Sequence, residues 1–70
     1  MIYHAPITVN GSPDRVLLGQ TIATLLRERG LAPECVVVEL NGRALTPGET
    51  KATPIQSGDV LEVVQIVAGG

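Results

Sequence analysis

Residues 58–70 read GDVLEVVQIVAGG, an apolar strand signal that runs directly into a pair of glycines. The segment from Val60 to Val67 is rich in β-branched residues, which favour strands. Glu62 determines the parity of this strand, because a charged side chain belongs on the solvent face. Leu61 and Val63 are therefore predicted to point into a core. The side chains predicted to point outward are those of Glu62, Val64 and Ile66.

The glycine pair at the end of this stretch is chemically informative. Glycine has no Cβ and tolerates unusual backbone angles, so Ala68-Gly69-Gly70 can pass through a slot too narrow for other residues. A free carboxylate on Gly70 would be the group on which chemistry is done. We expect one domain, residues 1–70, in which residues 67–70 form a flexible C-terminal tail.

The first part of the chain predicts a hairpin. Ile7-Thr8-Val9 alternates apolar and polar residues, and residues 15–18 (RVLL) resume a strand pattern. Asn10-Gly11 between them is a tight-turn signal. We interpret residues 1–6 as a flexible tail or as an extension of the first strand.

A helix is predicted after the break at Gly19. Thr21 is a suitable N-cap, and Gly30 is a suitable residue for the C-terminal stop. The helical spacing of the residues between them gives one apolar face. This face consists of Ile22, Leu25 and Leu26.

Residues 35–40 (CVVVEL) carry the strongest strand signal in the chain. Glu39 determines the parity here, so Val37 shares the outward face with it. The side chains predicted to point inward are those of Val36, Val38 and Leu40. Cys35, at the start of the strand, is interpreted as a small buried hydrophobic residue.

A second tight turn is predicted at Asn41-Gly42, with a short returning strand at residues 43–45. Residues 46–54 contain Thr, Pro, Gly and Lys and are interpreted as an irregular loop. Ile55 is its expected anchor in the core.

The order of elements is strand, strand, helix, strand, short strand, loop, strand. One helix covers one face of a sheet, so the pattern predicts an α+β roll with a mixed sheet of four to five strands. We expect the outer strands to come from the first hairpin. If the first and last strands lie side by side in the centre, they pair in parallel.

Composition excludes several functional classes. The net charge is −2, and the 5 Lys and Arg residues are scattered without a basic stripe, which argues against nucleic-acid binding. The apolar runs are too short for a membrane span, and no secretory signal is recognisable. Cys35 has no partner for an intrachain disulfide, so a reducing cytoplasm is the expected compartment.

Catalytic equipment is sparse. The chain has a single histidine, His4, and no glycine-rich phosphate loop or Cys/His cluster. We therefore predict that it is not an enzyme, that it binds no metal or cofactor, and that partners act on it.

The chain resembles the ubiquitin-like β-grasp sulfur carriers, specifically the ThiS type. The resemblance covers nearly the whole chain from Ile7 onward, and the order and spacing of its segments are more specific than any one of them. The matching segments are residues 7–11 (ITVNG), the helix with Thr21, Ile22, Leu25 and Leu26, residues 36–42 (VVVELNG) and residues 58–70.

The resemblance implies a reaction at Gly70. A ThiF-like enzyme would adenylate its carboxylate with ATP and magnesium, and a persulfide sulfur from a cysteine desulfurase would displace AMP. The resulting thiocarboxylate would deliver sulfur to a ThiG-like thiazole synthase. The residues implied to enter the partner's active site are Ala68, Gly69 and Gly70. Those implied to bind the partner are Val37, Glu62, Val64 and Ile66.

Other functions remain open at this point. Related carriers serve as the small subunit of molybdopterin synthase, in tRNA thiolation or in cysteine synthesis, and ubiquitin-like modifiers join the last glycine to a lysine of another protein. The molybdopterin relatives often place Pro-Pro before the diglycine. Residues 65–68 are QIVA here, which favours the thiazole pathway.

Overall fold

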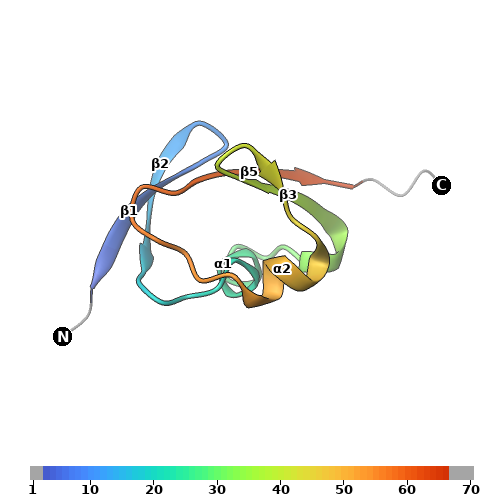
Figure 1. The fold of residues 1–70 in the computed structure, drawn as a ribbon, viewed down its shortest axis with the longest axis horizontal. Helices are drawn as coiled ribbons and strands as arrows, with labels where there is room; N and C mark the ends of the chain where they lie inside the picture. The colour runs from blue at the N-terminus through green and yellow to red at the C-terminus, as the bar shows by residue number, and fades with distance from the viewer. Residues whose placement is uncertain (1–2, 67–70) are drawn as a thin grey trace.

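The computed structural model describes residues 3–66 of the chain. A five-stranded mixed sheet lies on one side, and the helices lie on the other (Figure 1). This arrangement confirms the predicted α+β roll. The elements in chain order are β1 (His4–Val9), β2 (Ser12–Leu17), α1 (Ile22–Glu28), the 3-10 helix η1 (Pro33–Cys35), β3 (Val36–Leu40), β4 (Arg43–Ala44), α2 (Pro47–Ala52) and β5 (Val60–Gln65).

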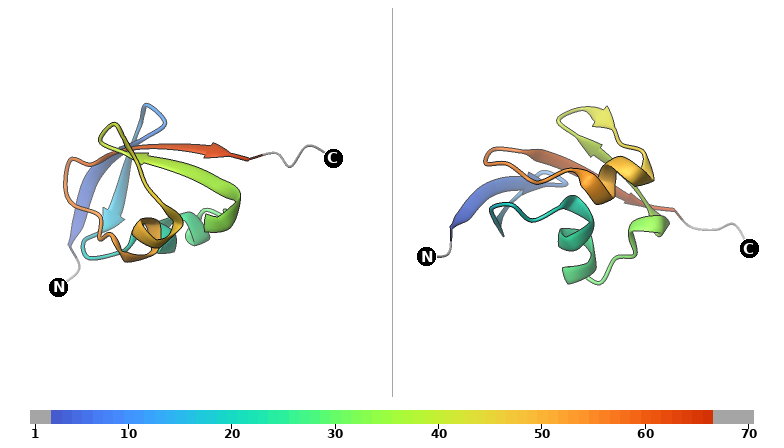
Figure 2. Two further views of the ribbon diagram at one scale, coloured as in Figure 1. Left: turned by 45° about the vertical axis from the view of Figure 1, so that its right-hand side comes forward. Right: turned by 60° about the horizontal axis from the view of Figure 1, so that its bottom comes forward.

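The last strand occupies the centre of the sheet. The strand order is β2-β1-β5-β3-β4, with β1 and β5 parallel and β3 antiparallel to β5. The central parallel pair is as expected. The prediction that both outer strands come from the first hairpin was wrong, because only β2 is an outer strand and β4 forms the opposite edge. Figure 2 shows the first hairpin and the β3–β4 hairpin on either side of β5.

Both Asn-Gly pairs form two-residue hairpin turns. Asn10 and Gly11 have φ of 50° and 79°, and Asn41 and Gly42 have φ of 51° and 86°. Positive φ at both central residues is the type I′ geometry, whose twist matches that of paired strands. The tight turn starts β2 at Ser12 and not at Arg15.

The N-terminal residues that the structure describes extend the first strand. β1 begins at His4, and the N–H of Leu18 donates to the carbonyl of Tyr3 at 3.0 Å. Of the two interpretations of residues 1–6, strand extension therefore holds for the part that begins at His4.

The predicted caps of α1 are present. The hydroxyl of Thr21 accepts a hydrogen bond from the N–H of Thr24 at 3.3 Å. At the other end the N–H of Gly30 donates to Arg27 and the N–H of Leu31 donates to Leu26, at 3.0 and 2.9 Å. These two bonds form a Schellman motif, for which the positive φ of Gly30 is required.

Residues 47–52 form a short helix, so the prediction of an irregular loop was wrong. Thr46 and Glu49 make a capping box, with bonds of 3.1 and 3.0 Å between side chain and backbone N–H in each direction. The backbone N–H of Thr46 and then the guanidinium of Arg43, 3.0 Å away, hold the pKa of Glu49 below its usual range. The signal is visible in the sequence as Thr46-Pro47-Gly48-Glu49, with proline at the first helical position.

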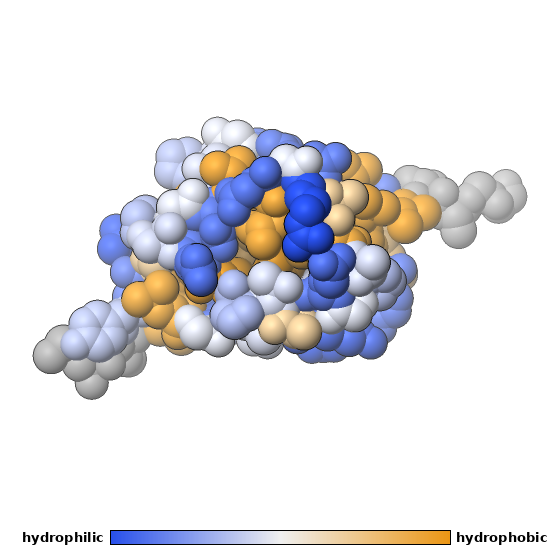
Figure 3. All heavy atoms as spheres, viewed as in Figure 1, coloured by the Kyte–Doolittle hydropathy of each residue, from blue (hydrophilic) through white to orange (hydrophobic). Residues whose placement is uncertain are grey.

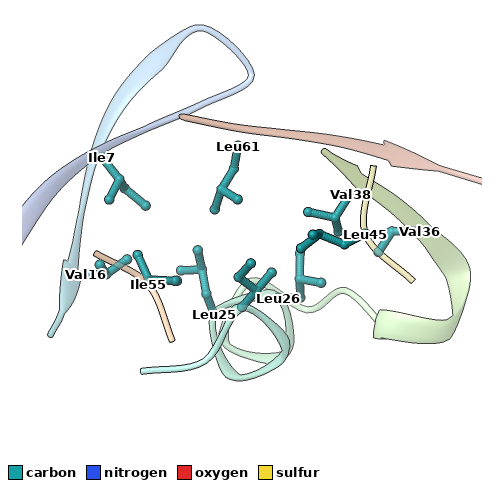
Figure 4. Packing of buried hydrophobic residues seen from close by; sticks show 10 residues of the cluster. Ile7, Val16, Leu25, Leu26, Val36, Val38, Leu45, Ile55 and Leu61 are labelled. Atoms are coloured by element: carbon teal, nitrogen blue, oxygen red, sulfur yellow. The ribbon is translucent and has the colours of Figure 1, made fainter. Parts of the chain in front are cut away.

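The core lies between the sheet and α1. Figure 4 shows Ile7 and Leu61 pointing from the sheet toward Leu25 and Leu26 of the helix. Ile55 is 2% exposed, which confirms it as the anchor of the segment that follows α2. None of the helices within residues 3–66 is long and apolar enough to cross a membrane.

An ion pair between Asp14 of β2 and Arg29 ties the edge strand to the end of α1. The hydrogen bond from Arg29 lowers the pKa of Asp14, and the N–H of Arg15 lowers it further. The same bond raises the pKa of Arg29. Both side chains remain partly exposed, so solvent screens much of the interaction.

We predict that Asp14→Asn lowers the free energy of unfolding at pH 7 by at most about 1 kcal/mol. Because folding depresses the pKa of Asp14, the contribution is present above the pKa of the unfolded chain and is lost as pH falls through the folded pKa. Urea unfolding of both proteins between pH 7 and pH 2 measures this difference. An Arg29→Met variant and the double variant complete the cycle, and a difference that persists at the lowest pH contradicts the assignment.

Candidate functional site

The C-terminal strand leads to the residues that were predicted to react. Ala68, Gly69 and Gly70 lie outside the described residues, as does Val67. Ile66 is the last described residue and follows β5 directly. In Figures 1 and 2 β5 leaves the domain at the end opposite to the start of β1.

The four residues predicted to bind partners share the outer face of the sheet. Val37, Val64 and Ile66 are 45, 63 and 55% exposed, and Glu62 is exposed as well. On the opposite face Leu61 is fully buried and Val63 is partly buried. The predicted parity of β5 is therefore confirmed, whereas the binding role of these residues stays a prediction.

Three of the exposed aliphatic side chains lie together at the C-terminal end of β5, and we call them the apolar trio: Val37, Val64 and Ile66. Val37 of β3 is directly opposite Val64 of β5, where side chains on one face touch. Ile66 continues the same face, and its N–H donates to the carbonyl of Cys35 at 2.8 Å. Figure 3 shows hydrophobic surface at the end of the molecule where β5 ends. Three aliphatic side chains grouped on a sheet face are typical of a protein-binding surface.

Two glutamates border the apolar trio on the same face. Glu39 of β3 is directly opposite Glu62 of β5, and both are exposed. Like charges opposite one another destabilise a strand pair. A basic side chain of a partner would relieve this repulsion. The sequence predicted that Glu39 points outward but did not identify it as a site residue, because the pairing register of β3 and β5 is a long-range property.

A groove of about 180 Å³ adjoins the apolar trio, and Val37 and Ile66 form part of its wall. The rest of the wall comes from η1, β3 and the segment that enters α2, which makes it mostly apolar. A partner side chain that contacts the trio can therefore also enter a recess at the edge of β3. The other lining residues are Pro33, Glu34, Val36, Leu45, Pro47 and Thr50.

A second groove, of about 260 Å³, lies on the inner side of the sheet beside the C-terminal half of α1. Its apolar floor consists of Leu25, Leu26, Leu31 and Val63, and Arg29 is among its polar residues. The remaining lining residues are Val9, Asn10 and Gln65. It faces away from the outer surface of β5 and is not continuous with the apolar trio.

The two residues with the most reactive side chains do not assemble into a site. Cys35 lies in η1 and is exposed, so the interpretation as a buried residue was wrong. Its strand was expected to start at Cys35, but Pro33 begins a 3-10 turn that holds this residue outside the sheet. His4 lies at the exposed start of β1. Within residues 3–66 no group of three or more potential metal-ligating side chains occurs.

The chain matches a known protein family over most of its length. The model described as the ThiS family matches residues 7–70. A sulfur carrier protein ThiS from Thermus thermophilus is 39% identical over 64 residues, which cover 91% of this chain and 98% of that protein. A thiazole synthase from Magnetococcus marinus is also 39% identical over 64 residues. The alignment covers 91% of this chain but spans only 20% of that longer protein.

Solved structures resemble the chain along nearly its full length. A crystal structure of the thiamine biosynthesis protein ThiS from Geobacter metallireducens is 35% identical, with a TM-score of 0.77 and coverage of 93% of this chain and 99% of that one. A solution structure of a thiamine biosynthesis protein from the same organism is 35% identical, with a TM-score of 0.75 and coverage of 93 and 87%.

Proposed function

Since this chain belongs to the ThiS family, we propose that the carboxylate of Gly70 is the group that carries sulfur. The protein is a sulfur carrier of thiamine biosynthesis and is not itself a catalyst. The observation that supports Gly70 is the extent of the family match, which runs to residue 70 and includes the diglycine. The reaction takes place in the cytoplasm.

The proposed chemistry has three steps, all carried out on Gly70 by partners. A carboxylate resists substitution because oxide is a poor leaving group, so a ThiF-like enzyme first joins Gly70 to AMP, using ATP and magnesium and releasing pyrophosphate. A persulfide sulfur supplied by a cysteine desulfurase then attacks the carbonyl carbon, and the bond to AMP breaks. A thiol then attacks the donor's sulfur atom and forms a disulfide with it, and the bond that breaks releases a thiocarboxylate, an anionic sulfur nucleophile.

This chain contributes reach and recognition to these steps. Four residues after Ile66, fully extended, span at most about 14 Å. That length allows Ala68, Gly69 and Gly70 to enter a buried active site while the folded domain stays outside it. The small side chains in this segment suit a narrow entrance.

Recognition is proposed to use the apolar trio and Glu62. The trio offers apolar area beside the exit of the chain, and its neighbouring groove of about 180 Å³ can accept an anchoring side chain. The opposed Glu39 and Glu62 favour a basic residue at the edge of the partner's surface. A partner that matches these features presents an apolar patch with Lys or Arg beside it.

The proposed acceptor of the sulfur is a thiazole synthase. Support comes from the Magnetococcus thiazole synthase, one fifth of which is the segment that this chain resembles. A carrier segment within the same polypeptide as the synthase indicates that the two act together.

We predict that the protein purified from its own cells contains a fraction with one oxygen replaced by sulfur at Gly70. Intact-mass spectrometry with fragmentation of the C-terminus measures this. A ladder of isopeptide-linked conjugates would indicate a protein modifier. Protein from sulfur-replete cells that carries neither modification contradicts the carrier chemistry.

We predict that deletion of Gly70 abolishes sulfur loading and thiazole formation without unfolding the domain. The described core ends before this residue, so the melting temperature should stay within error of the wild type. Circular dichroism checks the fold, and complementation of a strain that lacks its ThiS gene checks the function. If the deletion variant allows that strain to grow without added thiazole, the proposed mechanism is wrong.

We predict that Val64→Asp and Ile66→Asp each weaken binding to the adenylating enzyme by at least about tenfold. Both side chains are exposed, so the free energy of unfolding should change by less than about 1 kcal/mol. Isothermal titration calorimetry and urea unfolding give the two quantities.

Leu17→Asp is the matched control for these variants. Leu17 is 43% exposed and lies on the edge strand β2, with the opposite parity to the buried Val16. It is therefore an exposed aliphatic residue of the outer face, distant from the exit of β5. If Leu17→Asp weakens binding equally, the affinity depends on the overall charge of the outer face and not on the apolar trio.

A further inference from the structure

The side chain of Asn10 continues the pairing of β1 with β5 beyond the point where the backbone of β1 turns away. The registered pairs end at Val9 and Leu61, and the N–H of Asn10 makes a last backbone bond to Leu61 at 2.9 Å. The positive φ of Asn10 then directs the chain away from β5. The carboxamide of Asn10 replaces the missing backbone: Oδ1 accepts the N–H of Val63 at 2.7 Å, and Nδ2 donates to the carbonyl of Val63 at 3.1 Å.

This contact lies directly before the part of β5 that carries two residues of the apolar trio. Val63 directly precedes Val64, and Ile66 follows two residues after that. β3 pairs with this half of β5 along one side, as far as the bond from Ile66 to Cys35. On the other side, the registered pairs with β1 have already ended. The Asn10 carboxamide is thus the restraint that the first hairpin applies to the half of β5 that carries Val64 and Ile66.

We propose that Asn10 is a positioning residue for the loading of this carrier. By bonding both backbone groups of Val63, it holds the last part of β5 in one direction and so presents the apolar trio to the partner already ordered. Ordering that exists before binding does not have to be acquired during binding, which raises affinity. The proposal rests on the proposed function in that it assumes an adenylating enzyme that recognises the outer face of β5.

Asn41 provides a matched control within the same chain. It is also the first residue of an Asn-Gly turn with positive φ, and its carboxamide also binds β5. Its Oδ1 accepts the N–H of Val60 at 2.9 Å, and its Nδ2 donates to the carboxylate of Asp59 at 3.1 Å. These contacts lie at the start of β5, at the other end of the strand from Ile66.

The test compares Asn10→Gly with Asn41→Gly. Glycine accepts the positive φ of both turns, so each variant removes a carboxamide and keeps the turn. Amide hydrogen exchange at residues 63–66 reports the restraint, and ATP-dependent adenylation of the intact chain by the adenylating enzyme of the same organism reports the function. We expect Asn10→Gly to increase exchange at Val63 and Val64 by about tenfold and to lower the kcat/KM of adenylation by about tenfold.

Two further variants distinguish an effect on the position of β5 from a general loss of stability. Asn41→Gly should lower the melting temperature and leave kcat/KM near that of the wild type. Asn10→Asp keeps an acceptor for the N–H of Val63 and should restore part of the loss.

Three results would overturn the proposal: wild-type exchange at residues 63–66 in Asn10→Gly, wild-type kcat/KM in that variant, or an equal loss of kcat/KM in Asn41→Gly. If the wild-type chain is not adenylated at all, the proposed function fails. The exchange comparison then decides by itself whether Asn10 restrains the strand.

Discussion

The position of β5 between β1 and β3 is the constraint on which the rest of the structure depends. Leu61 of this strand is fully buried in the core, and Val63 on the same face packs partly buried against it. A slip of one residue would expose Leu61 and bury Glu62, which a small domain with a single aliphatic core could not tolerate. The register therefore also determines that Val64 and Ile66 face outward. Stability and the proposed docking surface therefore depend on the same alternation.

This arrangement divides the two faces of the sheet between two tasks. The inner face holds the domain together through aliphatic contacts with α1. The outer face carries exposed apolar side chains that contribute little to folding and can be used for recognition. The facing pair Glu39 and Glu62 keeps this face charged next to the apolar trio. Charge close to an exposed apolar group limits self-association while leaving the group available to a partner of opposite charge.

The two Asn-Gly turns serve the central strand as well as their own hairpins. In each turn the asparagine adopts a positive φ, a conformation that glycine reaches at lower energy. Each asparagine also uses its carboxamide to form a hydrogen bond with the backbone of β5. Glycine could close the turn, but it could not make these bonds. Each asparagine therefore makes a contact outside its hairpin, which in the case of Asn10 and Val63 joins residues 53 positions apart.

Local patterns in the sequence determined the secondary structure of most of the chain, the inward and outward faces of β3 and β5, the caps of α1 and both tight turns. These properties depend on residues that are close in the sequence. The capping box of α2 is equally local, and the spacing of Thr46 and Glu49 would have predicted it. The pairing of Glu39 with Glu62 and the bonds from Asn10 to Val63 were decided only by the tertiary structure. Each of these depends on which strands become neighbours and in what register. That choice is made by the burial of the whole core, which no short segment of the sequence specifies by itself.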